Sequence, residues 1–299
     1  MKKFIALLLA MLMVMGMVAC GAQEEVVEET TDVVEETVEE TEEVVEETEE
    51  VDEPEIESDL AYVTENGKML IGITIYEPMN YYDEAGNLTG FDTEFAQAVC
   101  DKMGLAAEFV EINWDTKEVE LAAKSIDCIW NGMTITEDRL ANMSISDPYV
   151  KNAQVIVVKA DSELAATADL VGKTVVAEMG SAGEAQITGE DANADLAQAE
   201  YVGLAKQTDC LMEIKAGTAD AAVLDWTLAK SMVGEGTDFA DLAIMEGVEL
   251  ATEEYGIAFR QGSDVTAAVN AVIAELVADG ILPALAEKYG LALAPALAG

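Results

Sequence analysis

Short apolar runs alternate with amphipathic segments along the chain from about residue 60 onward. Short runs rich in Val, Ile and Ala are typical of buried strands, whereas apolar residues that recur every three or four positions are typical of helices. We predict strands at residues 69–75, 108–112, 126–130, 153–158, 174–177, 219–224 and 256–259. We predict helices at residues 92–103, 116–124, 182–187, 206–216, 226–232, 265–279 and 282–289. This alternation predicts an α/β fold with mainly parallel sheets, in which ligands bind beyond the carboxyl ends of the strands.

The start of the chain has a different pattern, which predicts an export signal. Two lysines precede an apolar run at residues 4–18, which is short for a membrane span of about 20 residues and typical of a signal peptide. The run ends in MVACG at residues 17–21, which resembles the lipobox of bacterial lipoproteins. In a lipobox the cysteine receives a diacylglyceryl group, and two acyl chains give stable anchoring. We therefore predict a signal peptide at residues 1–19 and lipidation of Cys20. The alternative is a simple cleaved signal with an incidental cysteine.

Residues 20–59 form a low-complexity segment after the predicted lipidation site. Near-copies of EEVVEET fill much of it, and residues 24–59 contain no Lys or Arg. Like charges at this density repel one another, so the segment is expected to be extended rather than packed. We predict an acidic tether that holds the following domain away from an anionic membrane surface.

Composition excludes several classes of function. The 299-residue chain carries 60 acidic and 15 basic side chains, a formal net charge of −45, which makes nucleic acid an unsuitable partner. It has no histidine, the commonest general base and metal ligand, so we expect neither a metal site nor a cofactor. Besides Cys20, the cysteines are Cys100, Cys128 and Cys210, without a CxxC pair. Buried free thiols are the default expectation, with one disulfide as the alternative.

Arg139 is the most informative candidate for a binding residue. It follows NGMTITED at residues 131–138, in which Thr136 has the position of a helix N-cap. The helix dipole disfavours a cation at this end by a few tenths to about 1 kcal/mol. A surface ion pair with the acidic residues just before it would offset that cost. Alternatively, the guanidinium binds a ligand carboxylate in a bidentate manner, with Thr134 and nearby backbone N–H groups as further donors.

Other candidates lie where predicted strands end. MGSAGE at residues 179–184 opens a helix, so its backbone N–H groups can face a ligand, or the segment can be an ordinary turn. Asp225 can cap the helix that follows it or neutralise a ligand ammonium group. Tyr76 and Trp114 can form an apolar wall over a ligand or belong to the core. Trp130, inside a strand, is expected in the core.

Taken together, these segments resemble the family 3 extracellular solute-binding proteins, the polar amino-acid receptors of ATP-driven importers. The resemblance covers essentially the whole folded part of the chain and rests on the order and spacing of several motifs. These are YEPM at 76–79, NLTGFD at 87–92, NGMTITEDR at 131–139, SDPY at 146–149, GKTVV at 172–176, GTADAA at 217–222 and YGIAF at 255–259. It implies a periplasmic-binding-protein-like type II fold with two α/β lobes joined by a two-strand hinge. Lobe 1 would comprise residues 60–152 and 255–299, and lobe 2 residues 153–254.

The resemblance also implies that an amino acid binds between the lobes, which close over it by hinge motion. Arg139 and Thr134 would hold the α-carboxylate with help from nearby backbone, Asp225 would take the α-ammonium group, and the remaining residues would face the side chain or supply that backbone. The residues expected at the ligand are Tyr76, Trp114, Asn131, Gly132, Thr134, Arg139, Ser181, Ala182 and Asp225. A cation, an anion, donors at helix starts and aromatic walls also suit a zwitterion on chemical grounds.

The side chain of the ligand is less well specified. Family members that select cationic amino acids often carry an aspartate three residues before the aromatic residue, where this chain has Ile73. This disfavours a strongly basic ligand, although Glu77, Asp83 or Glu178 would be acidic substitutes. We therefore expect the substrate-binding lipoprotein of an ABC importer for amino acids, with polar or neutral ones favoured. Its partners would be a free amino acid and a membrane permease. It would be a monomer, attached to the outer face of the cell membrane through its lipid alone.

Three alternatives stay open. A dehydratase-like enzyme on the same fold would need an acid facing a leaving group, for which Glu178 or Glu184 would be candidates; we expect no enzyme. A sensor would dock on a membrane receptor instead of a permease. An acidic surface lipoprotein without a small ligand would not require Arg139 and Asp225 to meet in one cleft.

Overall fold

The strands of the described part of the chain form one large sheet and one small ribbon. The computed structural model describes residues 58–298, so the predictions for the signal peptide, Cys20 and nearly all of the tether lie outside the described residues. The nine-stranded sheet has the order β4-β1-β5-β11-β7-β10-β8-β9, and β6 pairs with β11. Its strands are β1 (Lys68–Ile73), β4 (Ala106–Glu111), β5 (Cys128–Thr134), β6 (Met143–Ile145), β7 (Val150–Lys159), β8 (Thr174–Glu178), β9 (Glu200–Leu204), β10 (Ala221–Asp225) and β11 (Leu242–Arg260). The ribbon pairs β2 (Tyr81–Tyr82) with β3 (Leu88–Thr89).

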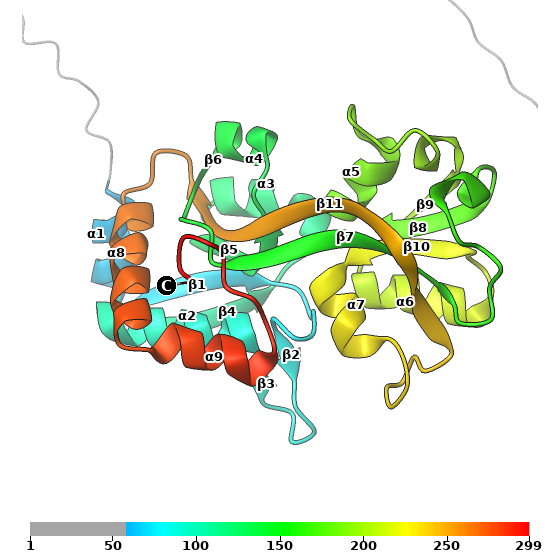
Figure 1. The fold of residues 1–299 in the computed structure, drawn as a ribbon. Coiled ribbons are helices and arrows are strands. Elements are labelled where there is room, and N and C mark those ends of the chain that lie inside the picture. Colours follow the sequence, from blue (N-terminus) through cyan, green and yellow to red (C-terminus); the bar gives the residue numbers. More distant parts are fainter. Residues whose placement is uncertain (1–57, 299) are drawn as a thin grey trace, which may run out of the picture. The chain divides into compact units, whose positions relative to one another are not determined.

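Two groups of strands flank the long strands β7 and β11. In the first group β1 pairs in parallel with β4 and β5, and in the second group β8 pairs in parallel with β9 and β10. Strands β7 and β11 pair antiparallel with each other, and they join the first group through β5 and the second through β10. Figure 1 shows these two long strands running from one group of elements to the other.

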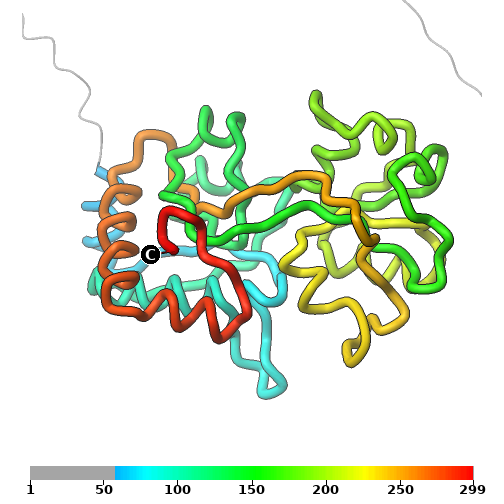
Figure 2. The backbone as a smooth tube through the Cα atoms, in the orientation of Figure 1, coloured from blue at the N-terminus to red at the C-terminus, as the bar shows by residue number. Residues whose placement is uncertain are grey.

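Helices pack on both groups of strands. Figure 2 traces the path of the backbone through both groups. The first group carries α1 (Asp59–Asn66), α2 (Phe91–Met103), α3 (Lys117–Ala122), α4 (Glu137–Asn142), α8 (Val265–Ala278) and α9 (Ile281–Tyr289). The second group carries α5 (Ala182–Thr188), α6 (Gln207–Ala216) and α7 (Trp226–Met232). Short 3₁₀ turns lie at Trp114–Thr116, Thr167–Leu170 and Leu196–Gln198. The chain thus enters the second group along β7 and returns to the first along β11.

Buried hydrophobic clusters pack the strands against the helices. In the first group Trp130 is fully buried and makes an edge-on contact with Phe95, with ring centroids 5.0 Å apart, as expected for a core residue. On β7, Val157 belongs to one buried cluster and its neighbours Ile156 and Val158 belong to another. Because successive side chains of a strand point to opposite faces, β7 contributes to two cores at once.

The prediction of an α/β fold is confirmed, and most predicted elements agree with the structure within a few residues. The extent of β11 was predicted wrongly, since the sequence pattern indicates a strand at 256–259 alone and the strand begins at Leu242. Residues 242–255 include several acidic side chains and show no regular alternation of apolar and polar positions. Pairing with β7 keeps this segment extended, so the segment does not need a buried face that a sequence pattern would reveal. The short strand β9 was not predicted either. Its side chains alternate between exposed and half-buried, without a buried face.

The three cysteines of the described region are buried free thiols, which confirms the default expectation. Between residues 58 and 298, no single helix is long and apolar enough to cross a membrane. The pair α8 and α9 meets the same length and composition test together, with a bend of 80° between them.

Candidate ligand-binding site

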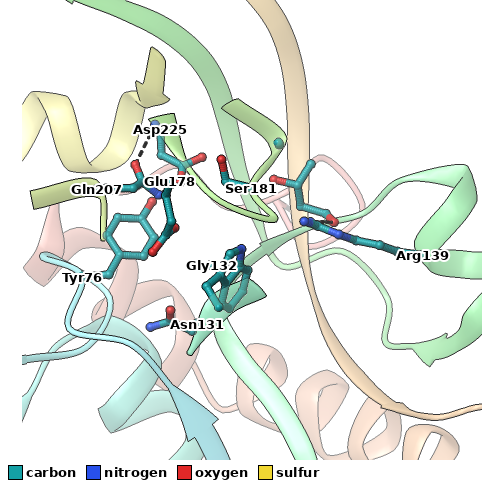
Figure 3. A pocket seen from close by; sticks show the side chains of 11 residues that line it. Tyr76, Asn131, Gly132, Arg139, Glu178, Ser181, Gln207 and Asp225 are labelled. Carbon is teal, nitrogen blue, oxygen red and sulfur yellow. Dashed lines mark hydrogen bonds between the residues drawn. The ribbon is translucent and has the colours of Figure 1, made fainter. Parts of the chain in front are cut away.

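One cavity is lined by all of the residues that the sequence analysis expects to contact a ligand. Its lining residues are Tyr76, Trp114, Asn131, Gly132, Thr134, Arg139, Glu178, Ser181, Ala182, Gln207 and Asp225 (Figure 3). The nine expected residues are all present, together with Glu178 and Gln207. They come from both groups of elements, although they are separated by up to about 150 positions in the sequence. Their role in binding stays a prediction, but the structure brings them together.

The cavity lies where parallel strands end. Thr134 is the last residue of β5, Glu178 the last of β8 and Asp225 the last of β10, and Tyr76 follows β1. The carboxyl ends of strands in both groups therefore face one another across the cavity, which is where α/β folds bind their ligands.

The cavity has little free space between its lining residues. The space open to the centre of a water molecule is about 10 Å³, which is room for about one water. An amino acid has several times the volume of a water molecule. Entry of such a ligand therefore requires the two groups of elements to separate, or the lining side chains to move.

Gly132 and Asn131 form the floor of the cavity through tight internal contacts. Gly132 has a φ of 56°, and a Cβ atom there would lie 2.7 Å from the Tyr76 ring, so the position requires glycine. Its backbone N–H, expected to face a ligand, donates instead to Asp92 Oδ2 at 2.7 Å. The side-chain amide of Asn131 donates to the Thr74 carbonyl and to Asn80 Oδ1, at 2.9 and 2.7 Å. Both residues line the cavity, but these N–H donors are occupied within the wall.

Arg139 is a buried cation that bridges the two groups of elements. Thr136 caps α4 by accepting the Arg139 backbone N–H at 3.2 Å, as predicted. The guanidinium donates from Nη1 to the Thr134 carbonyl at 2.7 Å and from Nη2 to the Gly180 carbonyl at 3.1 Å. Arg139 is 7% exposed and makes no ion pair with any carboxylate of residues 58–298, so the surface ion pair considered above is wrong. Burial lowers the pKa of this guanidinium.

Lys117 is a second buried cation, which the sequence did not single out. Its ammonium group donates to the carbonyls of Gly180 and Trp114 at 2.9 and 3.1 Å and lies 4.9 Å from the centroid of the Trp114 ring. Burial, followed by the charge of Arg139, lowers the pKa of Lys117 to about 8. Two positive charges therefore converge on the carbonyl of Gly180, in the turn before α5.

Asp225 is held by side-chain amides rather than by a cation. Its Oδ1 accepts from Asn152 and Gln154, both at 2.6 Å, and its Oδ2 accepts from the Gln207 amide. The Gln207 carbonyl also accepts the backbone N–H of Asp225 at 3.0 Å. Although Asp225 precedes α7, its side chain makes no capping hydrogen bond. Asp225 therefore lines the cavity without capping α7 through its side chain, and the capping alternative does not apply.

The segment around Ser181 begins α5, as the sequence predicts. Ser181 Oγ accepts the backbone N–H of Glu184 at 3.0 Å and acts as the N-cap of the helix. The Glu184 carboxylate accepts the Gly180 N–H at 2.7 Å and the Tyr201 hydroxyl at 2.7 Å. Glu184 therefore orders this turn from behind and does not line the cavity.

Tyr76 closes the cavity between the two groups. Its hydroxyl hydrogen-bonds to the Tyr255 hydroxyl at 2.6 Å and to the Thr227 hydroxyl, which belongs to α7. Burial raises the pKa of Tyr76, so the phenol stays neutral. Trp114 is 5% exposed on the same cavity wall. Both aromatic residues thus line the cavity and also belong to buried hydrophobic clusters, and a contact with a ligand stays a prediction.

Glu253 connects the two ends of the site, and sequence reasoning missed it. Its Oε1 accepts from the Thr134 hydroxyl at 2.8 Å, from Gln154 at 2.8 Å and from Asn152 at 2.5 Å. Burial, followed by the charge of Asp225, raises the pKa of Glu253 to about 7. The residue lies on the part of β11 that was not predicted as a strand, so no pattern pointed to its partial burial.

Comparison with known proteins gives consistent matches. Residues 69–292 match the model of the bacterial extracellular solute-binding proteins, family 3. The L-cystine-binding protein TcyJ of Escherichia coli (strain K12) is 32% identical over 237 residues, which cover 78% of this chain and 86% of that protein. The arginine-binding extracellular protein ArtP of Bacillus subtilis (strain 168) is 30% identical over 231 residues, covering 76% and 88%. The structure of holo ArgBP from T. maritima is 36% identical, with a TM-score of 0.66 and coverage of 77% and 98%.

Proposed function

Because the chain belongs to the bacterial extracellular solute-binding proteins of family 3, we propose that it binds a free amino acid as the substrate-binding component of an ABC importer. One observation carries this proposal. Arg139, a buried cation without a carboxylate partner in residues 58–298, lines the same cavity as Asp225, a buried anion without a cation there. Buried charges are costly unless they are paired, and an α-amino acid carries both opposite charges on adjacent atoms. The zwitterion would neutralise both residues at once.

The ligand α-carboxylate would bind at Arg139. A guanidinium has five N–H donors, of which two meet the carbonyls of Thr134 and Gly180, so donors remain for a carboxylate. The Thr134 hydroxyl would turn from Glu253 toward the ligand. The α-ammonium group would bind at Asp225, and Tyr76 and Trp114 would flank the side chain. The closed cavity means that the ligand enters before the two groups of elements come together.

We further propose that the two groups act as the lobes expected from the sequence, 60–152 with 255–299 and 153–254. Strands β7 and β11 would form the hinge. Support comes from the crossing of these two strands between the groups and from a cavity lined by both. Hinge closure around a ligand is a common device of two-lobed binding proteins. Binding would trap the amino acid in the closed form, which the permease would then recognise.

The setting of the protein is part of the proposal. A lipid on Cys20 would attach the chain to the outer face of the membrane, and the acidic segment would act as its tether. The chain would work as a monomer that delivers its ligand to a permease. The relatives named above are binding proteins by name, which supports a binding role rather than an enzymatic one.

A ligand screen tests the proposal. The full chain, shown to be folded and freed of carried-over ligand, is melted with each of the twenty amino acids and with cystine. A ligand at 100 times its dissociation constant stabilises a protein by about 2.7 kcal/mol, enough to raise the melting temperature by several degrees. We expect a clear shift with one or a few α-amino acids. The absence of a shift with all of them would contradict the proposal.

A further inference from the structure

The structure separates the three acidic residues that sequence reasoning left as substitutes for an aspartate at position 73. Glu77 accepts a hydrogen bond from Ser231 at 3.1 Å and does not line the cavity. Asp83 accepts backbone N–H groups within an exposed turn. Glu178 lines the cavity and is 4% exposed. Of these three, Glu178 alone is in a position to meet a bound ligand.

Glu178 is the least compensated of the three carboxylates at the site. Asp225 and Glu253 each accept hydrogen bonds from three side chains. For Glu178, Gln207 is the side-chain donor seen in the described region, and no residue there forms an ion pair with it. Figure 3 shows its side chain reaching from the end of β8 toward Tyr76 and Gly132, in the middle of the cavity. Its carboxylate therefore faces the space in which the ligand side chain would lie.

The charges around the cavity do not balance for a neutral ligand. With every group ionised, Asp225, Glu178 and Glu253 bring three negative charges, and Arg139 and Lys117 bring two positive ones. A zwitterion adds no net charge, so it leaves one negative charge in excess inside a closed site. An unpaired buried carboxylate is avoided either by taking up a proton or by pairing with a cation. A positively charged ligand side chain supplies that cation.

We propose that Glu178 is the specificity-determining residue of the site and selects an amino acid whose side chain carries a second positive charge, such as arginine, ornithine or lysine. This inference rests on the proposed amino-acid binding function. The sequence analysis disfavoured a strongly basic ligand because Ile73 replaces an aspartate. The proposal reverses that expectation, because Glu178 supplies the negative charge from the second group of elements instead of from β1. A neutral amino acid binds more weakly, since it brings no cation to pair with the Glu178 carboxylate.

The proposal has a consequence for proton exchange. Burial, followed by the charge of Asp225, raises the pKa of Glu178 to about 8, so the unliganded carboxyl group is largely protonated at pH 7. A cationic side chain would displace this proton, whereas a neutral one would not. Affinity for the cationic ligand should therefore increase as the pH rises toward 8. The charged and titratable groups that act on Glu178 from other elements are Lys117, Arg139, Asp225 and Cys210, and Tyr76 lines the same cavity.

Two matched ligand pairs provide the test. Arginine is compared with citrulline, in which a neutral ureido group replaces the guanidinium, and lysine is compared with norleucine. Calorimetric titration of the full chain at pH 8 should give at least about tenfold tighter binding of the cationic member of one pair, since an opposite charge shifts a carboxylate pKa by 1 to 3 units. At pH 7, titration in two buffers of different ionisation enthalpy should reveal release of a proton with the cationic ligand and none with the neutral one.

Substitutions assign the effect to Glu178. Glu178→Gln should remove the preference and the proton release while citrulline or norleucine still binds. Lys117 has a pKa of about 8 as well, and a proton released from it would still be released in this variant. Loss of the release therefore assigns the proton to Glu178. Glu77→Gln is the matched control and should change neither readout. If Glu178→Gln fails to fold, the measurement of proton release by the unmodified chain still tests the proposal.

The possible failures are distinguishable. Equal or tighter binding of the neutral members, or a preference that survives Glu178→Gln, would overturn the role of Glu178 and leave amino-acid binding intact. If neither these ligands nor any of the twenty amino acids binds to folded, ligand-free protein, the inference and the proposed function both fail.

Discussion

The cationic and anionic ends of the cavity are built differently. Asp225 is surrounded by amides of Asn152 and Gln154 on the long strand β7 and of Gln207 on α6, so its partners lie on a connecting strand and in the second group of elements. Arg139 contacts one carbonyl in its own group, that of Thr134, and one across the cavity, that of Gly180. An opening of the cleft would leave the surroundings of Asp225 intact and remove half of those of Arg139. The difference suggests that the anionic end is preformed and that closure completes the cationic end.

Removal of the cation should have the largest effect. Arg139→Ala should weaken amino-acid binding by at least about 100-fold, because breaking a buried charge pair costs about 3–5 kcal/mol. Calorimetric titration measures the loss, and circular dichroism should show an unchanged fold. Arg260→Ala is the control, since Arg260 pairs with Asp59 and Asp127 and does not line the cavity. It should lower stability without lowering affinity, and unchanged affinity in Arg139→Ala would refute the carboxylate assignment.

Loss of the negative charge at the preformed end should have the next largest effect. Asp225→Asn should weaken binding of an amino acid by about 2–5 kcal/mol, as for other buried charge pairs that lose one partner. The deaminated analogue of the same ligand should be affected far less, because it has no ammonium group to lose. Competition titrations with both compounds provide the measurement. Equal losses for the two would argue against a role for Asp225 at the ammonium group.

The ligand-free protein should become more stable as the pH falls from 8 toward 5. Burial raises the pKa of Glu253 and of Asp92 to about 7 and that of Glu178 to about 8. In the unfolded chain these carboxyl groups ionise near pH 4. Their protonated forms therefore favour the folded state, an advantage present at low pH and lost as the pH rises through the folded-state values.

Urea unfolding at several pH values measures this trend. Replacement of Glu253 by Gln, which keeps a hydrogen-bonding group for Thr134 and its neighbours, should flatten the curve by about 1–3 kcal/mol. Glu249→Gln, at an exposed position of β11, is the control and should leave the curve unchanged. A variant of Glu253 with the same pH dependence as the original chain would mean that this carboxyl group is ionised throughout.

The floor of the cavity should tolerate no side chain at Gly132. Gly132→Ala places a Cβ atom 2.7 Å from the Tyr76 ring at a φ of 56°, so the ring must move and the backbone is strained. We expect a loss of stability of about 1–2 kcal/mol and weaker binding, because the Tyr76 hydroxyl contacts Thr227 on α7 and Tyr255 on β11. Gly262→Ala is the control for the backbone alone, since its φ is 75° and a Cβ atom there meets nothing. Similar losses in both variants would show that the ring contact is unimportant.

Thr134 should give the smallest effect. Its hydroxyl donates to Glu253 in the closed cavity and is expected to reach the ligand carboxylate, so Thr134→Val removes one hydrogen bond. Affinity should fall by about 0.5–1.5 kcal/mol, and Thr134→Ser should retain it. A titration of both variants against the same amino acid tests this. Full affinity in Thr134→Val would restrict Thr134 to a contact with Glu253.

The residues found from sequence are those whose position along an element reveals them. Arg139 was visible because it is a cation in the first turn of a helix, and Asp225 because a carboxylate ends a buried apolar strand. Lys117 and Glu253 were not visible, since their burial depends on partners far away in the sequence, Gly180 and Gln154 among them. A local pattern can thus place a side chain at the end of an element, but it does not reveal which distant backbone will cover it.

The most direct test is a titration of the ligand-free chain with the amino acid that stabilises it most, alongside two altered forms of the same compound. Its methyl ester lacks the carboxylate charge, and its deaminated analogue lacks the ammonium group. The account predicts that the parent binds and that each altered form binds at least about 100-fold more weakly, because each leaves a buried charge unpaired. Binding of either altered form as tightly as the parent would contradict recognition of a zwitterion between Arg139 and Asp225.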